Sequence, residues 1–271
     1  MKKIKLISKQ KLDKNLDLRN LSLLNGNSNY NSILNIKVLY GNTQIKLGEL
    51  FDIEMNDISK EEIEIEIFGT NHNCDYIGWR WDKGSLKIYG DVGSFLGAKM
   101  SGGNISIKGS AENFVGSEMT GGNILVKKNV LDFLGSPLPG GKVGMNGGEI
   151  IVSGKARNYL ALNMRRGLIY VNSDLENFGC NNMVAGTVIL RKSIGKNFGM
   201  GMKRGSIFVN NIQFCRDNFR EVGFASFSFF ETLNNYINKK YKLKIFKNSK
   251  SVIRYFGDTK VNGNGEIFVE N

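Results

Sequence analysis

The hydrophobic pattern repeats every 19 residues between Lys83 and Asn210. A glycine opens each repeat, and the intervals between successive opening glycines are 19, 19, 26, 19, 19 and 19 residues. A fixed period of about 20 residues is typical of solenoid proteins, in which each repeat packs only on its neighbours. The sequence therefore predicts a solenoid with a single insertion. The opening glycines are Gly84, Gly103, Gly122, Gly148, Gly167, Gly186 and Gly205.

A short alternating segment follows each opening glycine. Aliphatic side chains stand two and four residues after the glycine, as in Leu86 and Ile88 or Ile169 and Val171. Alternation with period two, mostly in β-branched residues, predicts one β-strand per repeat. A helix would place its apolar residues three and four apart, and a 19-residue repeat has no room for a helix beside the strand.

Three further positions recur along the repeats. An aromatic residue stands eleven places after the opening glycine, a small residue two places later, and a methionine three places before the next glycine. Because stacking brings equivalent positions together, we expect the aliphatic, aromatic and methionine side chains to form ladders inside the solenoid. The aromatic position holds Phe95, Phe114, Phe133, Tyr159 and Phe178, with Asn197 and then Phe198 in the sixth repeat. The small position holds Gly97, Gly116, Gly135, Ala161, Cys180 and Gly199, and the methionines are Met100, Met119, Met145, Met164, Met183 and Met202.

The pattern as a whole predicts an all-β solenoid, a right-handed parallel β-helix of about seven 19-residue coils. Residues 62–211 form these repeats, and the alternating segment Ile63–Ile67 supplies the first strand. Terminal coils would expose unpaired strand edges. We therefore expect residues 1–61 to form an N-terminal β cap and residues 212–271 a C-terminal capping extension.

The C-terminal extension mixes a helix with strands. A helix over roughly residues 227–239 would carry Phe229, Leu233, Tyr236 and Ile237 on one face. Strands are expected after it near residues 243–246, 253–256 and 265–269.

The insertion lies between Gly135 and Met145 and contains Pro137 and Pro139, the only prolines in the chain. Proline cannot donate to a strand ladder, so these residues predict a loop that leaves one corner of the solenoid. Loops that protrude from rigid scaffolds often carry function. We expect residues 136–144, with Pro137, Pro139 and Lys142, to contact a partner.

A basic corner stands just before two of the opening glycines. It consists of Arg165 and Arg166 in one repeat and of Lys203 and Arg204 two repeats later. Stacking would place the two pairs about 10 Å apart on one edge. This corner is either a solvated rim or a contact for an acidic partner or an anionic ligand.

Composition adds few candidates for chemistry. The 271-residue chain has a formal net charge of +12, but no motif of an RNA-binding module accompanies it, so no nucleic-acid partner is expected. The start lacks a signal-peptide core and no 18-residue apolar run occurs, which favours a cytoplasmic protein without a membrane partner.

The candidate metal ligands do not form a recognisable motif. His72 is the only histidine, and Cys74, Cys180 and Cys215 form no C-x-x-C pair. The methionine ladder is better explained as core packing than as a soft-metal site. We therefore expect no catalytic, cofactor-binding or metal-binding residues in this chain.

The repeated block resembles the C subunit of formylmethanofuran dehydrogenases, tungsten or molybdenum enzymes of methanogenic archaea. Its units match G-x-x-M-x-G-G-x-I, and Met100–Ile105 and Met119–Ile124 form the M-x-G-G-x-I part of two of them. Gly141–Ile150 resembles the inserted repeat of that family, and Tyr255–Ile267 resembles its ending. The likeness covers roughly residues 62–269. Ala161 and Cys180 depart from the family's glycines, and the unit alone is shared with the C-terminal β-helix domain of glutamate synthases.

The resemblance implies a non-catalytic structural subunit of a cytoplasmic oxidoreductase complex. That complex reduces CO2 with ferredoxin electrons and forms N-formylmethanofuran in the first step of methanogenesis. The resemblance also implies molybdopterin with tungsten or molybdenum, iron–sulfur clusters and a binuclear metal site, all on other subunits. It leaves open whether the metal is tungsten or molybdenum.

Three other classes of protein are compatible with a β-solenoid. A stand-alone glutamate-synthase-type β-helix domain would act as an inter-domain scaffold. A polysaccharide-active β-helix enzyme would need clustered Asp and Glu on one face, which the sequence does not offer. A nucleic-acid binder would need a basic stripe, and its binding would weaken with salt.

Overall fold

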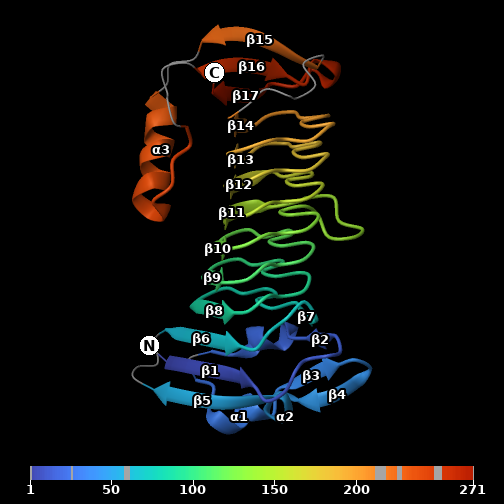
Figure 1. Ribbon diagram of the computed structural model, residues 1–271, viewed down its shortest axis with the longest axis vertical. Coiled ribbons are helices and arrows are strands. Elements are labelled where there is room, and N and C mark those ends of the chain that lie inside the picture. Colours follow the sequence, from blue (N-terminus) through green and yellow to red (C-terminus); the bar gives the residue numbers. More distant parts are fainter. Residues whose placement is uncertain are drawn as a thin grey trace.

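The computed structural model describes residues 2–25, 27–57, 62–210, 218–224, 228–246 and 252–270. These residues form one long sheet of 13 strands and a smaller sheet of four. The long sheet runs along the height of the molecule (Figure 1). In pairing order its strands are β15 (Phe219–Phe224), β16 (Val252–Gly257), β17 (Gly265–Glu270), β14 (Ser206–Val209), β13 (Thr187–Leu190), β12 (Arg166–Val171), β11 (Asn146–Val152), β10 (Asn123–Val126), β9 (Asn104–Ile107), β8 (Ser85–Tyr89), β6 (Ile63–Phe68), β1 (Lys2–Ser8) and β5 (Phe51–Asp57).

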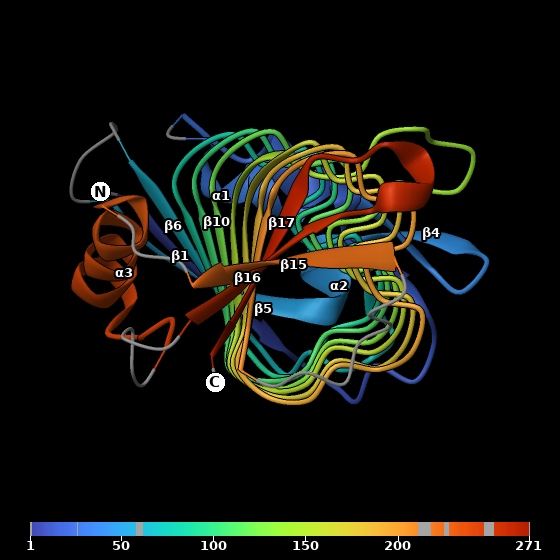
Figure 2. The ribbon, with the colours of Figure 1, turned by 90° about the horizontal axis from the view of Figure 1, so that it is seen from above.

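Each repeat contributes one strand to the long sheet, and neighbouring repeats pair in parallel. Ile105 of β9 stands opposite Ile124 of β10, and Ile169 of β12 stands opposite Val188 of β13, so the register follows the 19-residue period. Seen along the stack, the repeats lie over one another (Figure 2). The prediction of a β-rich stack with one parallel strand per repeat is therefore confirmed, with β6 as its first repeated strand.

The methionine position lies inside the stack, as predicted. Its side chains explain why the repeats open with a glycine. Met100 and Met164 are fully buried. A Cβ added to Gly186 would lie only 2.8 Å from the Met164 methyl, and a Cβ on Gly122 only 2.5 Å from the Met100 methyl. These glycines are thus required by packing as well as by backbone geometry, since φ at Gly186 is 108°.

The aromatic position does not lie inside, and this prediction was wrong. Its residues adopt positive φ, for example 67° at Phe95 and 64° at Phe133, and their rings are half-buried. A left-handed residue breaks the inward–outward alternation of the chain. The next residue occupies the core instead, as the burial of Leu96 and Leu134 shows. The rings stack with centroids 4.5 to 5.2 Å apart, in the order Tyr76, Phe95, Phe114, Phe133, Tyr159 and Phe178.

Non-repetitive strands close both ends of the long sheet. β1 pairs in parallel with β6 and antiparallel with β5, and β16 pairs antiparallel with both β17 and β15. The N-terminal segment also contributes most of the smaller sheet and three short helices. The strands of that sheet are β4 (Thr43–Lys46), β3 (Lys37–Tyr40), β2 (Leu16–Asp17) and β7 (Cys74–Asp75), and the helices are η1 (Arg19–Leu23), α1 (Tyr30–Leu34) and α2 (Leu47–Leu50).

Helix α3 (Ser228–Tyr241) lies beside the outer face of the long sheet (Figure 1). It agrees with the predicted helix, whose first residue, 227, lies outside the described residues. Phe230 and Ile237 of α3 are buried in a second hydrophobic cluster with Phe208 of β14. The helix is therefore held by the outward-facing side chains of the strands.

The segment after α3 differs from the prediction. Residues 243–246 form no strand, and Ile245 and Phe246 are instead buried against the second cluster. The strands predicted near 253–256 and 265–269 are confirmed as β16 and β17, which η3 (Thr259–Val261) connects. Strand β15 was not predicted.

Candidate functional site

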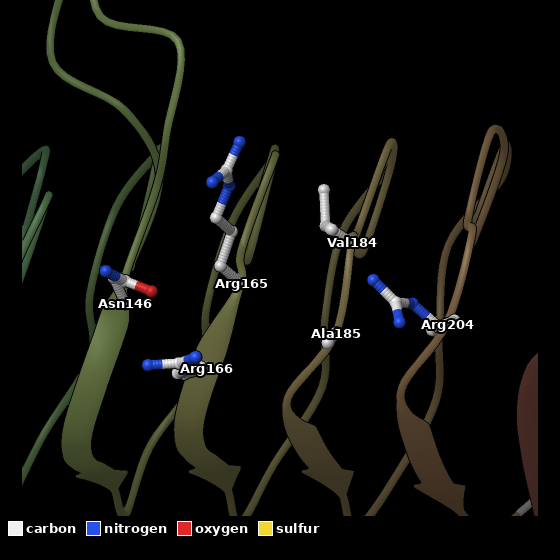
Figure 3. A pocket seen from close by; sticks show the side chains of 6 residues that line it. All are labelled: Asn146, Arg165, Arg166, Val184, Ala185 and Arg204. Carbon is white, nitrogen blue, oxygen red and sulfur yellow. The ribbon is translucent and has the colours of Figure 1, made fainter.

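The basic corner forms a notch in the edge where the strands begin. A cavity of about 440 Å³ is lined by Asn146, Arg165, Arg166, Val184, Ala185 and Arg204. Figure 3 shows Arg166 and Arg204 on either side of the short side chains of Val184 and Ala185, with Arg165 above Arg166. We call these six residues the basic notch. Lys203 belongs to the same corner but does not line the cavity.

Backbone hydrogen bonds fix the spacing of the basic notch. The N–H groups of Arg165, Val184 and Lys203 each donate to the carbonyl of a core methionine one repeat earlier, at 2.9, 2.8 and 2.8 Å. The same bond in successive repeats holds the corners at the strand spacing of about 4.8 Å. The basic side chains thus project from corners whose backbone is hydrogen-bonded from one repeat to the next.

The basic side chains of this corner have no acidic partner among the described residues. Arg165, Arg166, Lys203 and Arg204 are exposed, and none of them forms an ion pair there. By contrast, Arg157 lies 3.4 Å from Glu176. Guanidinium groups that form no ion pair within the described residues remain available to an anion from outside.

The inserted loop lies next to the basic notch. A second depression of about 300 Å³ is lined by Lys142, Val143, Asn146, Glu118 and Thr120. Since Asn146 lines both cavities, the two form one continuous surface. The structure therefore brings together two features that were predicted separately.

Hydrogen bonds hold the inserted loop in place. The Glu118 carboxylate accepts the Leu138 N–H at 3.1 Å, and the Gly141 N–H donates to the Leu138 carbonyl at 2.7 Å. Pro139 at the tip is exposed, whereas Pro137 is buried against the stack. A partner would meet Pro139 and Lys142 directly, while Pro137 supports them from below.

The candidate metal ligands were His72 and the three cysteines. His72 is exposed, while Cys74 is buried and its burial raises the pKa of its thiol to about 11. Burial also raises the pKa of Cys180 far above its ordinary value, and Cys215 lies outside the described residues. Across the described part of the chain, no three His, Cys, Asp or Glu side chains gather to hold a metal ion. No helix in that part is long and apolar enough to cross a membrane.

Two features of the molecular surface were not predicted from the sequence, and only the first belongs to the basic notch. Asn146 stands two places before Gly148, the position that holds Arg165 and Lys203 in later repeats, so the repeat alignment contained the signal for its place in the notch. A separate depression of about 260 Å³ beyond the ends of the strands is lined by Tyr89, Gly90, Asp91, Lys108, Gly109 and Lys128. Its lysines follow the alternating segments and could have been found by the same alignment.

Comparison with known proteins places the chain in a family. The family model described as GXGXG motif matches residues 73–258, which is more than half of the chain. The chain belongs to the GXGXG motif family. It is also similar to the C subunit of the tungsten-containing formylmethanofuran dehydrogenase 2 of Methanocaldococcus jannaschii, with 36% identity over 58 residues. That alignment spans 21% of this chain and 21% of the relative, so it covers about a fifth of either protein.

A solved structure matches the chain from end to end. It is a chain of the formyltransferase/hydrolase complex FhcABCD from Methylorubrum extorquens, crystallised with methylofuran. The TM-score is 0.90 at 28% sequence identity, and the match covers 98% of this chain and 99% of the other. The resemblance stated from the sequence is thereby confirmed, and this chain is similar to a chain of a multi-subunit complex.

Proposed function

We propose that this chain is a non-catalytic structural subunit of a formylmethanofuran dehydrogenase complex, which reduces CO2 and forms N-formylmethanofuran in the first step of methanogenesis. The observation that carries the role as a subunit of such a complex is the end-to-end similarity to a chain of the FhcABCD complex, at a TM-score of 0.90. The partial similarity to the C subunit of a formylmethanofuran dehydrogenase favours the dehydrogenase. The molybdopterin with tungsten or molybdenum, the iron–sulfur clusters, the binuclear metal site and the link to ferredoxin belong to other subunits in this proposal.

The proposed role is mechanical. We interpret the stack as a right-handed parallel β-helix of about seven coils with a capping segment at each end. Side-chain ladders stiffen it, because Asp132, Asn158 and Asn177 each accept a backbone N–H from the next repeat, at 2.9 to 3.1 Å. A stack bonded in this way can hold other subunits at fixed separations.

The loop at residues 136–144 is the proposed contact with a catalytic subunit. Regular repeats close in 19 residues, so folding alone does not require the insertion. The exposed tip at Pro139 and Gly140 stands on a base held by Glu118. Such a loop presents a defined shape without an ordering cost on binding.

A second candidate is the corresponding scaffold of a formyltransferase/hydrolase complex. The observation that favours it is that the end-to-end match is to a complex of that name. The two candidates place this chain in the same structural role but predict different chemistry in the assembled complex. A stand-alone glutamate-synthase-type domain is a third possibility, and it predicts an amidotransferase or flavin-domain partner.

Affinity purification of the tagged chain from its own cells, followed by mass spectrometry, tests the proposal. We expect formylmethanofuran dehydrogenase subunits in fixed ratio to this chain, and CO2-dependent formation of formylmethanofuran by the purified complex. Formyl transfer without CO2 reduction would favour the second candidate. Recovery of glutamate synthase components, or of the chain alone, would contradict both.

A further inference from the structure

The basic notch has two cationic walls and a small apolar floor. Arg166 and Arg204 form the walls, and Val184 and Ala185 form the floor between them (Figure 3). The arginines are exposed, whereas the floor residues are half-buried. Like charges held close together on one edge repel each other. A negatively charged partner would relieve this repulsion, so its binding at the notch is favoured.

The spacing of the walls selects among the shapes that an acidic partner can take. Arg166 and Arg204 project from corners two repeats apart, which is about 10 Å. An α-helix returns to nearly the same face after seven residues, a rise of about 10.5 Å. A β-strand places residues of the same face about 6.7 Å apart. That distance matches neither one repeat step of about 4.8 Å nor two steps of about 10 Å.

We propose that the basic notch binds an acidic helix of a partner subunit. Asp or Glu side chains at positions i and i+7 of that helix contact Arg166 and Arg204. A small or aliphatic side chain at i+3 or i+4 rests over Val184 and Ala185. The planar guanidinium fork suits a carboxylate, which it can hold through two parallel hydrogen bonds.

The surroundings of the notch fit a helix lying along the stack. Arg165 and Lys203 add positive charge at the flanks. Asn146 continues the surface to Lys142 in the inserted loop, so one helix could span both features. This inference rests on the proposed function, because a partner subunit is present only if the chain belongs to a complex.

Zero-length cross-linking in the purified complex tests the contact directly. In the R166K/R204K variant the charges are kept, and a carbodiimide can couple each introduced amine to a carboxylate that touches it. We expect both positions to couple to carboxylates seven residues apart on one partner segment. Coupling to an extended segment, to this chain itself, or to no carboxylate in an intact complex would overturn the proposal.

Charge reversal with a matched control distinguishes the contribution of the basic notch to partner binding from that of other basic residues. We expect R166E/R204E to lower the partner recovered per mole of tagged chain by roughly tenfold at low salt. The control K192E/K196E makes the same charge change at two exposed lysines that form no ion pair among the described residues, and it should recover the partner as the parent does. Equal recovery by both variants would overturn the notch and leave the proposed function standing, whereas failure of the parent to recover any subunit would overturn the proposed function.

Discussion

At the scale of single residues, the repeat is set by pairs of positions that face each other across neighbouring repeats. At every opening glycine from Gly122 to Gly205, an added Cβ would lie within 3 Å of a methionine methyl group. At Gly103 the added Cβ would instead meet the Trp81 ring. The small position follows the same rule, since a Cβ on Gly97 would lie 2.5 Å from the Ile124 Cδ1. The opening glycines and the methionines of the sequence pattern therefore pack against each other.

Gly186→Ala tests this contact. The new Cβ would meet the Met164 methyl at 2.8 Å in a backbone with φ of 108°, and we expect a loss of about 2–4 kcal/mol in the free energy of unfolding. Gly140→Ala is the matched control, because φ there is 81° and nothing lies within 4 Å of the added Cβ. Denaturant titration of both variants measures the difference. If Gly140→Ala costs as much as Gly186→Ala, backbone strain alone explains the glycine.

At the scale of elements, the strands, their register and the helix α3 could be predicted from the sequence, whereas the outward path of the aromatic position and the part of the sheet that α3 covers were not. Period-two alternation located one strand per repeat, but it did not show that positive φ at Phe95 and its equivalents would turn the rings outward. The residue three places after the opening glycine indicates which part of the sheet the helix α3 covers. It is polar in Lys87 and Ser106 and apolar in Ile151 and Ile189, and α3 covers only the apolar part.

The end of α3 is held by a polar cluster, which makes its attachment depend on pH. Burial alone would raise the pKa of Glu149, but hydrogen bonds from Tyr236, Tyr241 and Lys240 outweigh it, so the pKa is lowered. Lys240 also lies 3.1 Å from the Glu149 carboxylate. A lowered folded-state pKa gives stability that is present above the ordinary glutamate pKa and is lost as the pH falls through the folded value.

We therefore expect the amide protection of α3 to fall in acid before that of the sheet. Hydrogen exchange measured as a function of pH reports both at once, after correction for the intrinsic exchange rate. In Glu149→Gln the protection of α3 should already be reduced at neutral pH and should no longer change over the same range. Unchanged protection of α3 in the parent down to the pH at which the sheet itself opens would show that the apolar cluster alone holds the helix.

The inserted loop is a separate element, and its removal should spare the fold. Shortening residues 136–144 to the regular repeat length leaves the pairing of β10 with β11 in place, so we expect the melting temperature to change by no more than a few degrees. Co-purification of the proposed complex should weaken. A Gly–Ser loop of the original length is the control, and equal recovery with all three loops would make the insertion irrelevant to assembly.

At the scale of the whole molecule, the chain offers a basic, β-rich body with further strands at both ends of the long sheet and one continuous surface at its edge. The chain has a net charge of +12, but its cations are not equally available to a partner. Some form ion pairs within the chain, as Lys87 does with Glu64 at 2.6 Å. The cations of the basic notch are not paired within the described residues. The sequence could predict which residues make this corner, because stacking fixes their positions. It could not predict that the loop and the corner share one surface, because that depends on the path of the insertion.

We propose that this chain organises a formylmethanofuran complex and performs none of its chemistry. The most direct measurement assays activity and metal content in parallel, in the purified complex and in the same chain separated from it. We expect formylmethanofuran formation and the metals to stay with the complex, and the isolated chain to keep its β-rich fold with neither. Formylmethanofuran-dependent activity, or one tightly bound metal ion per isolated chain, would contradict it.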